Sequence, residues 1–262
     1  MEKIINIAQI RIKFDFKSKK LLNAIEKIYS EYQVKKPDYD ILIKLKYKKY
    51  QKGEKKLSAK IKDNKLYFEF IKISGFYDFK NKKGEFYIQD SEIAFYSLLR
   101  VIFSYSAPFF NAFYIHASAV FNTQYGIMAT GISGAGKSTF AKTMSKQGFK
   151  VIHDDLVLIR KIDNKFYIFS IPFIKDPLFK FEKKQKIELT HLFFLGKSQN
   201  NTIKNMSTKE IYKNLMRMLL SFTELPICFH KSYLNLIGEL IKATKISRLI
   251  YNPETIEIKK FL

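Results

Sequence analysis

The sequence predicts an α/β protein with a mixed sheet, preceded by a small α+β domain. Two observations lead to this fold class. Residues 1–95 contain short segments of alternating apolar and polar residues separated by turn residues, a pattern typical of hairpins. Residues 96–262 contain an apolar strand, a glycine-rich loop and an amphipathic helix in direct succession, followed by further strands and helices. We therefore predict two domains, residues 1–95 and residues 96–262.

The N-terminal part predicts strands around one helix. Residues 4–16, IINIAQIRIKFDF, suit a strand, and residues 38–50, DYDILIKLKYKKY, alternate as a strand does. Between them, apolar residues at helical spacing predict one helical face, formed by Leu21, Leu22, Ile25, Ile28, Tyr29 and Tyr32. Turn signals then predict a meander of hairpins, at QKGEK, KDNK and KNKKGE.

A helix from about Ser91, which can cap it with Glu92 in the first turn, follows these hairpins and leads into the second part. Residues 111–121, NAFYIHASAVF, predict a strand that forms a hairpin with the strand GIMAT, residues 126–130. A helix from Lys137 follows the glycine-rich loop, and Gly148 terminates this helix in the C′ position. Later signals predict strands over 149–155, 156–171 (with an Asp-Asn turn), 188–196 and 247–253, and helices over 207–220 (with a Ser207–Glu210 capping box) and 230–242.

The composition limits the classes of partner. The formal net charge is +23, with +10 on residues 1–95 and +13 on residues 96–262, and only five of the basic residues are Arg. Because the charge is spread over both parts and consists of lysine, we favour a solvated lysine surface over a dedicated nucleic-acid face. The field should still attract anionic ligands.

The apolar segments and the cysteine content indicate a cytoplasmic protein without a membrane span. The most apolar stretch, residues 97–115, is interrupted by Arg100 and Pro108 and predicts a buried helix. The N-terminus lacks the apolar run of a signal peptide. The single cysteine, Cys228, cannot build a disulfide framework or a cysteine metal site, and we expect it to be buried and inert.

Residues 130–139, TGISGAGKST, meet the pattern G-x-x-x-x-G-K-[ST] of a phosphate-binding P-loop (Walker A motif) in the required strand–loop–helix context. Glycines let backbone N–H groups turn inward around phosphate oxygens, and the helix N-terminus adds a partial positive charge. Lys137 would reach the β- and γ-phosphates, and the Ser138 hydroxyl would ligate Mg²⁺. The motif predicts that a nucleoside triphosphate, with ATP as the main candidate, binds through Gly131, Ser133, Gly134, Ala135, Gly136, Lys137, Ser138 and Thr139.

Two acids and a histidine flank this loop in the sequence. Asp154 and Asp155 follow Lys137 by seventeen residues, which leaves room for one helix and one returning strand. Carboxylates at the end of such a strand could hold Mg²⁺ and accept a proton from an attacking hydroxyl, although an Asp-Asp pair is also common in exposed turns. His116 lies on the strand before the loop strand, and a lone histidine is more often structural.

The three segments IHASAV, TGISGAGKST and GFKVIHDD together resemble the kinase domain of bacterial HPr serine kinase/phosphorylase. They resemble still more the shorter HPr-kinase-related proteins encoded beside peptide-modification systems, some of which phosphorylate a serine of a lasso-type precursor peptide. The phosphoenolpyruvate carboxykinases are more distant relatives. The resemblance runs from about His116 to Asp155, and loosely on to SRLIYNPE, residues 247–254. It implies a P-loop kinase core of the HPr-kinase/carboxykinase type in residues 96–262, with Asp154 as catalytic acid/base, Asp155 assisting the metal and His116 near the reacting phosphate.

The resemblance and the departures from it leave several functions open. It favours an ATP- and Mg²⁺-dependent kinase that phosphorylates a serine hydroxyl of a peptide or small protein. The glycine-rich signature linked to phosphorolysis is missing after Asp155, so we expect no phosphorylase activity and an acceptor other than HPr itself. Lys175, in IFSIPFIKDP, is either a substrate contact or a surface lysine.

The alternatives are a small-molecule kinase, for example of free serine, and a non-kinase P-loop ATPase. An ABC-type ATPase is disfavoured because the chain has no LSGGQ-like signature. The HPr kinases assemble as hexamers, so a homo-oligomer is one option that the sequence leaves open.

Overall fold

A computed structural model describes residues 1–35, 38–50, 57–70, 72–172, 185–221 and 223–262. The chain forms two compact units, the first built mainly from Met1–Ser106 and the second from Ala107–Ile171, Lys175–Leu220 and Leu225–Leu262. The predicted limit between residues 95 and 96 falls inside helix α2 (Glu92–Ser106), which belongs to the first unit. The division into a domain of residues 1–95 and a domain of residues 96–262 stays a prediction. Two earlier expectations, a turn at residues 51–55 and a contact by Lys175, lie outside the described residues.

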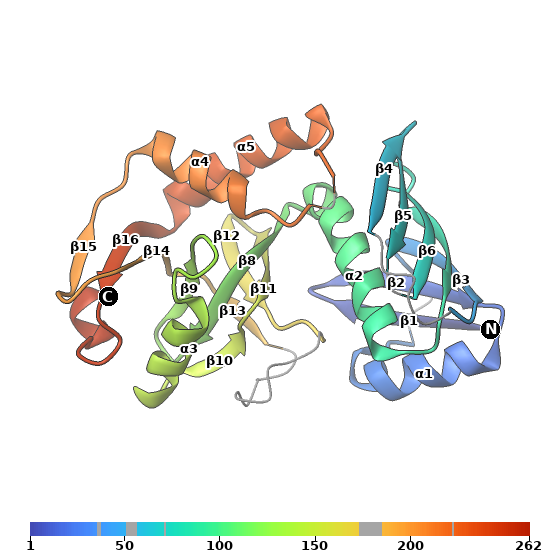
Figure 1. The fold of residues 1–262 in the computed structure, drawn as a ribbon, viewed down its shortest axis with the longest axis horizontal. Helices are drawn as coiled ribbons and strands as arrows, with labels where there is room; N and C mark the ends of the chain where they lie inside the picture. Colours follow the sequence, from blue (N-terminus) through green and yellow to red (C-terminus); the bar gives the residue numbers. More distant parts are fainter. Residues whose placement is uncertain (36–37, 51–56, 71, 173–184, 222) are drawn as a thin grey trace. The chain divides into compact units, whose positions relative to one another are not determined.

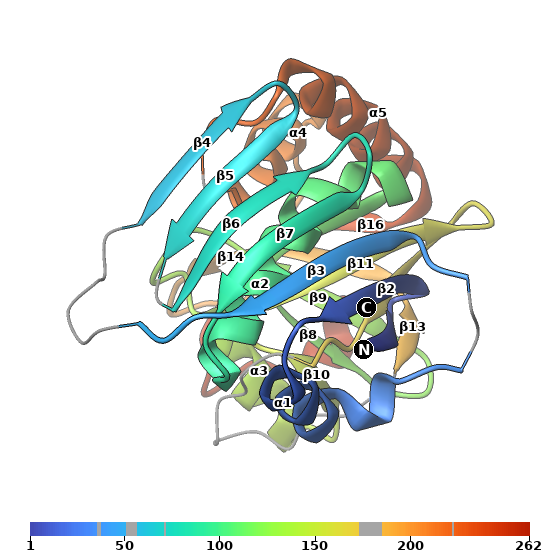
Figure 2. The same ribbon diagram turned by 90° about the vertical axis from the view of Figure 1, so that its right-hand side faces the viewer.

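The first unit contains a seven-stranded sheet within the described residues, whose strands lie side by side in Figure 2. Helix α1 (Lys19–Tyr29) packs on β2 and β3, and α2 packs on β6. The alternation predicted for β3 is confirmed, because Ile41, Ile43 and Leu45 are fully buried. In spatial order the strands are β1 (Glu2–Ile7), β2 (Ile10–Phe16), β3 (Ile41–Tyr47), β7 (Lys83–Ile88), β6 (Ile73–Asp78), β5 (Lys65–Phe70) and β4 (Ser58–Lys62).

The prediction of one strand over residues 4–16 is wrong. The segment is a hairpin, with β1 and β2 paired antiparallel from Glu2↔Asp15 to Ile7↔Ile10. Ala8 and Gln9 form the turn with φ of 54° and 61°, a left-handed conformation that usually selects Gly, Asn or Asp. Neither residue is of a type that signals such a turn. The alternation of apolar residues therefore suggested one continuous strand instead of two strands joined by a turn.

The second unit contains a nine-stranded mixed sheet within the described residues. Strands β9, β14 and β16 are parallel neighbours, and the other pairs are antiparallel, so the predicted mixed sheet is observed. Strand β10 pairs with the edge of β8 that β11 also uses. The main strand order is β13 (Lys186–Glu188), β12 (Lys165–Phe169), β11 (Leu156–Ile162), β8 (Ala112–Phe121), β9 (Gly126–Thr130), β14 (His191–Lys197), β16 (Lys245–Tyr251) and β15 (Thr202–Lys204), with β10 (Lys150–His153) off this path.

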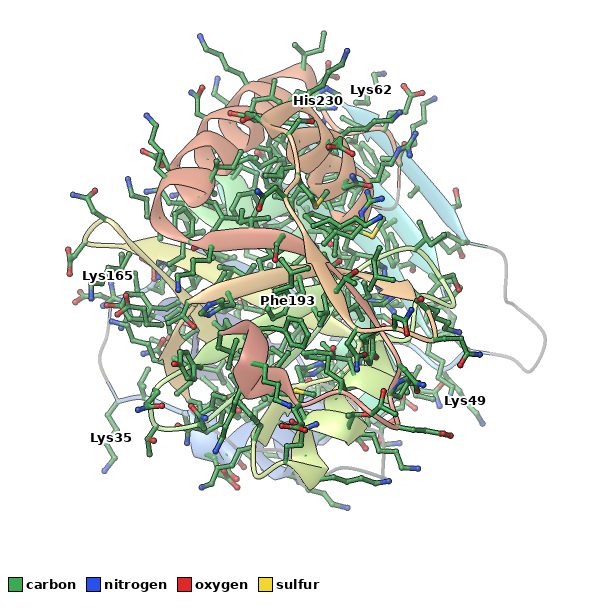
Figure 3. The ribbon with its side chains drawn as sticks, turned by 90° about the vertical axis from the view of Figure 1, so that its left-hand side faces the viewer. Lys35, Lys49, Lys62, Lys165, Phe193 and His230 are labelled. Atoms are coloured by element: carbon green, nitrogen blue, oxygen red, sulfur yellow. The ribbon has the colours of Figure 1, made fainter. Side chains whose placement is uncertain are left out.

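Helices cover both faces of this sheet, with α3 (Lys137–Lys146) on one side and α4 (Thr208–Met218) and α5 (Ile227–Ala243) on the other (Figure 1). The buried face of α3 comprises Phe140, Ala141 and Met144, which join a core with β9, β14 and β16. Phe193 of β14 lies inside this core, with its ring 6.5 Å from that of Phe140, whereas Lys165 lies at the periphery (Figure 3). The structure also contains three predicted features of this unit: the helix that starts at Lys137, the Ser207–Glu210 capping box, and Gly148 with a positive φ after the end of α3.

Several details of the second unit differ from the prediction. Helix α5 starts at Ile227, directly after Pro226, instead of at residue 230, and the short strands β13 and β15 were not expected. Cys228 is exposed, which corrects the expectation of burial. It lies in the first turn of α5, next to Phe229, which occupies the buried face of the helix instead.

One apolar segment has the length of a membrane span. The 19-residue stretch Glu92–Phe110, made of α2 and the 3-10 turn η2 (Ala107–Phe110), contains an 18-residue window with a mean hydropathy of 1.4. Because 67% of this window is buried within the protein, the stretch is weak evidence for a membrane helix. The buried helix predicted for this region is observed.

Candidate active site

The glycine loop connects the fully buried strand β9 to the first residue of α3, Lys137. Gly134 and Gly136 have φ of 78° and 97°, the left-handed region that side chains with a Cβ rarely adopt. At Gly131, an added Cβ would lie 2.8 Å from the Cβ of Ala135, because the loop folds back on itself. Three of the predicted loop glycines are thus required by the backbone path that the structure shows.

The Lys137 side chain forms hydrogen bonds with the backbone of its own loop. Its Nζ donates hydrogen bonds to the carbonyl oxygens of Gly131 and Ile132, at 2.9 and 3.2 Å. Phe140 N donates to Gly136 O at 2.7 Å, so the glycine carbonyl receives the first bond of the helix. Ser138 and Thr139 are exposed in the first turn, where backbone N–H groups of a helix lack internal acceptors. The loop therefore presents an ammonium, hydroxyls and a helix N-terminus together, a combination suited to an anion.

Two further side chains reach the loop, and the sequence analysis did not identify them. The Tyr251 hydroxyl donates to Gly136 O at 3.3 Å, and burial raises the pKa of Tyr251 to about 12. The Cε of Lys197 lies 3.7 Å from the position that a Cβ on Gly136 would take. Both residues end strands that run parallel to β9, and they lie in register with each other. Their position beside the loop follows from the parallel pairing of β9, β14 and β16. The order of strands in a sheet cannot be predicted from local sequence patterns, so the sequence did not reveal these two residues.

The two acids lie at a kink in the sheet. Strands β10 and β11 pair one after the other with the same edge of β8, and Asp154 and Asp155 connect them. The backbone there is still held to β8, because Ala117 N donates to Asp155 O at 3.1 Å. We expected the acids on a strand beside the loop strand, but β8 lies between β9 and β10. The acids reach the same end of the sheet because β10 and β9 are both antiparallel to β8.

The side chain of His116, on β8, contacts the side chain of Asp155, in the connection between β10 and β11. The His116 Nδ1 lies 3.5 Å from Asp155 Oδ1, and their side chains are 40% and 57% exposed. The backbone of His116 also joins the loop strand, since Thr130 Oγ1 donates to His116 O at 2.7 Å. The Thr130 hydrogen bond and the His116–Asp155 contact therefore connect the residue before Gly131, the histidine and one acid across neighbouring strands. Asp154 is less exposed than Asp155.

The donors suit Mg²⁺ bound together with phosphate better than a metal held by protein alone. Within the described part of the chain, no three His, Cys, Asp or Glu side chains form a cluster that could hold a metal ion. Mg²⁺ is commonly held by one or two carboxylates, water and substrate phosphates, so such a cluster is not needed. The oxygen ligands available are the Ser138 hydroxyl at the start of α3 and the Asp155 carboxylate.

Comparisons with known proteins give limited information. No family model matches the sequence, and no curated protein matches it. Among solved structures, the HPr(Ser) kinase/phosphatase from Coxiella burnetii is similar with a TM-score of 0.25 and 19% identity. The match covers 33% of this chain and 61% of that protein.

Proposed function

We propose that the protein is a kinase that transfers the γ-phosphoryl group of ATP to a serine hydroxyl of a peptide or small protein. One observation carries the proposal. A glycine loop with its lysine at a helix N-terminus lies at the same sheet end as an acid pair and a histidine, joined to it through β8. A phosphate-binding loop alone would serve many functions, whereas a nearby carboxylate supplies the proton acceptor that transfer to a hydroxyl needs.

Each residue has a distinct role in this reaction. The loop amides and Lys137 bind the β- and γ-phosphates, for which Lys137 must exchange its carbonyl partners for phosphate oxygens. Asp154 accepts the proton of the acceptor serine as its oxygen bonds to the γ-phosphorus and the bond to the bridging oxygen breaks, releasing ADP. Ser138 and Asp155 would hold Mg²⁺, which when bound neutralises charge on the phosphates. His116 orients the Asp155 carboxylate through their contact.

The choice of a peptide acceptor rests on the sequence. The segments around His116, the loop and Asp154 resemble most those of the HPr-kinase-related proteins, some of which are peptide-serine kinases. The formal charge of +23 would gather an acidic peptide near the surface and increase its encounter rate, an effect that salt should weaken. Both points favour a peptide over a small neutral alcohol.

A transfer assay tests the proposal. The protein is incubated with γ-labelled ATP and Mg²⁺, and label is followed into acidic serine peptides encoded by neighbouring genes, into free serine and into inorganic phosphate. The expected result is label on a peptide serine. Label on free serine but on no peptide would replace the proposal by a small-molecule kinase. Release of phosphate without any acceptor labelling would indicate a P-loop ATPase.

A further inference from the structure

We propose that a cavity beside the glycine loop binds the nucleoside part of the donor, so that the enzyme uses a nucleotide in preference to an inorganic polyphosphate. This inference rests on the proposed function, because it takes the phosphate site at the loop as given. The cavity has a volume of about 530 Å³ and lies between α3 and the turn that follows β16. Its walls include Thr139, Lys142, Thr143, Lys146, Pro253 and Glu254.

The cavity continues directly from the loop. Thr139 is the last residue of the loop motif and also the first wall residue of the cavity. An α-helix rises 1.5 Å per residue, so Thr143 lies about 9 Å beyond Lys137 along the axis of α3. Strands β9 and β16 are both parallel to β14, which brings the turn after β16 to the same sheet end as the loop. A ligand with its phosphates at the loop can therefore extend along α3 into the cavity.

The lining suits a ribose and a base. Pro253 and the buried Ile256 supply an apolar platform, which the aliphatic stems of Lys142 and Lys146 can extend. Glu254 can accept hydrogen bonds from ribose hydroxyls, and Thr139 and Thr143 can donate or accept. Pockets for small ligands combine apolar walls with a few placed polar groups in this way.

The charge of the cavity favours an anionic ligand. In the part of the chain that the structure describes, neither Lys142 nor Lys146 has a carboxylate oxygen within 4 Å. Two ammonium groups without acidic partners therefore border the path from the loop to the cavity. They would attract a ligand that carries phosphates.

The wall opposite α3 is held in place before any ligand arrives. The Gln147 side chain donates to Ile256 O at 2.8 Å and accepts from Ile258 N at 3.1 Å. Asn252 N donates to Asn201 Oδ1 at 2.8 Å, and the neighbouring Tyr251 hydroxyl bonds to Gly136 O of the loop. These bonds connect the cavity wall to both ends of the α3 region, so little ordering is needed on binding.

Calorimetric titration with two ligands tests the inference. ATP and inorganic triphosphate, each with Mg²⁺, are titrated into the wild type, Thr143→Phe and the control Ser145→Phe. Ser145 is exposed on the same helix but does not line the cavity. The wild type and Ser145→Phe should bind ATP at least about tenfold more tightly than triphosphate. Thr143→Phe fills the cavity and should reduce ATP affinity to that of triphosphate, with triphosphate binding unchanged.

The two proposals fail in different ways. Equal binding of ATP and triphosphate by the wild type, or an ATP preference that survives Thr143→Phe, would refute the nucleoside site and leave the loop site standing. Failure of the wild type to bind either ligand would refute the proposed function itself. If Thr143→Phe does not fold, as circular dichroism would show, Glu254→Ala decides instead. Glu254 is exposed on the opposite wall, and an unchanged ATP preference in that variant would count against the site.

Discussion

The two sides of the candidate site are built from different parts of the chain. On the loop side, backbone geometry makes the site, since Gly134 and Gly136 are left-handed and Lys137 is bonded to loop carbonyls. On the acid side, side chains make it, since His116 and Asp155 meet at 3.5 Å while both remain largely exposed. The loop is thus fixed by local conformation, whereas the acid pair depends on which strands become neighbours.

This difference indicates which substitutions should affect nucleotide binding and which should affect phosphoryl transfer. Changes on the loop side should reduce nucleotide binding, because they remove phosphate contacts. Changes on the acid side should leave binding in place and reduce transfer, because they remove a proton acceptor or a metal ligand. The predictions below probe this contrast, beginning with the largest expected effect.

Replacing Lys137 with Ala should reduce phosphoryl transfer by about 10³-fold, the scale expected for one charged contact to developing negative charge. The protein should stay folded, because the bonds of the lysine to described residues are to carbonyls of its own loop. ATP titration and the transfer assay measure the two effects, with the exposed Lys259→Ala as control. Unchanged binding and transfer in Lys137→Ala would show that the loop is a structural turn.

Substitution of the two acids should have unequal effects. Asp154→Asn should reduce kcat by about 10²–10⁴-fold, the range for loss of a general base, without weakening ATP binding. Asp155→Asn should instead raise the Mg²⁺ concentration needed for half-maximal transfer. Steady-state kinetics over a Mg²⁺ series separates the two. The reverse result would assign the base to Asp155, which is the acid that contacts His116.

Acid should weaken the fold at the far end of the strand that leads to Lys197. His191 is the first residue of β14 and is buried. Burial, reinforced by the Lys245 charge, lowers its pKa from 6.5 to about 4. The unfolded chain therefore binds more protons, so His191 contributes stability above about pH 6.5 that is lost as the pH falls towards 4, by up to about 3 kcal/mol.

Urea unfolding at pH 5 and pH 8 measures this effect. His191→Phe should flatten the difference between the two pH values, whereas substitution of the exposed His230 should leave it unchanged. This would locate the acid sensitivity of folding outside the active site. An unaltered pH difference in His191→Phe would contradict the prediction and point to other groups.

The sequence predicted the parts of the fold that local pattern determines. The glycine loop, the helix from Lys137 and the Ser207–Glu210 capping box were all found because each is encoded within a few residues. The turn at Ala8 and Gln9 was missed because neither residue signals a left-handed φ. The partnership of His116 with Asp155, and the approach of Lys197 and Tyr251 to the loop, depend on strand order, which no local pattern contains.

The smallest expected effect is a difference in ATP affinity between alanine variants of two glycines, Gly134 and Gly148. Both glycines have a positive φ, but they lie at different positions in the fold. Gly134 has φ of 78° and lies in the loop, whereas Gly148 has φ of 86° and lies after the C-terminal end of α3. Within the described part of the chain, a Cβ added at either position would have no protein atom within 4 Å apart from those of the glycine itself and its chain neighbours. Alanine should therefore cost each variant only backbone strain, about 1–2 kcal/mol of folding free energy.

The two variants should differ in ATP binding. At Gly134 the empty space around the added Cβ is where phosphate oxygens would lie, and relaxation of the strained φ would turn the loop N–H groups away from them. Gly134→Ala should therefore bind ATP more weakly than Gly148→Ala, although urea unfolding shows the same loss of stability for both. Equal ATP affinity in the two variants would mean that the loop conformation serves only to connect β9 to α3, and the contrast between a backbone-built and a side-chain-built half of the site would no longer hold.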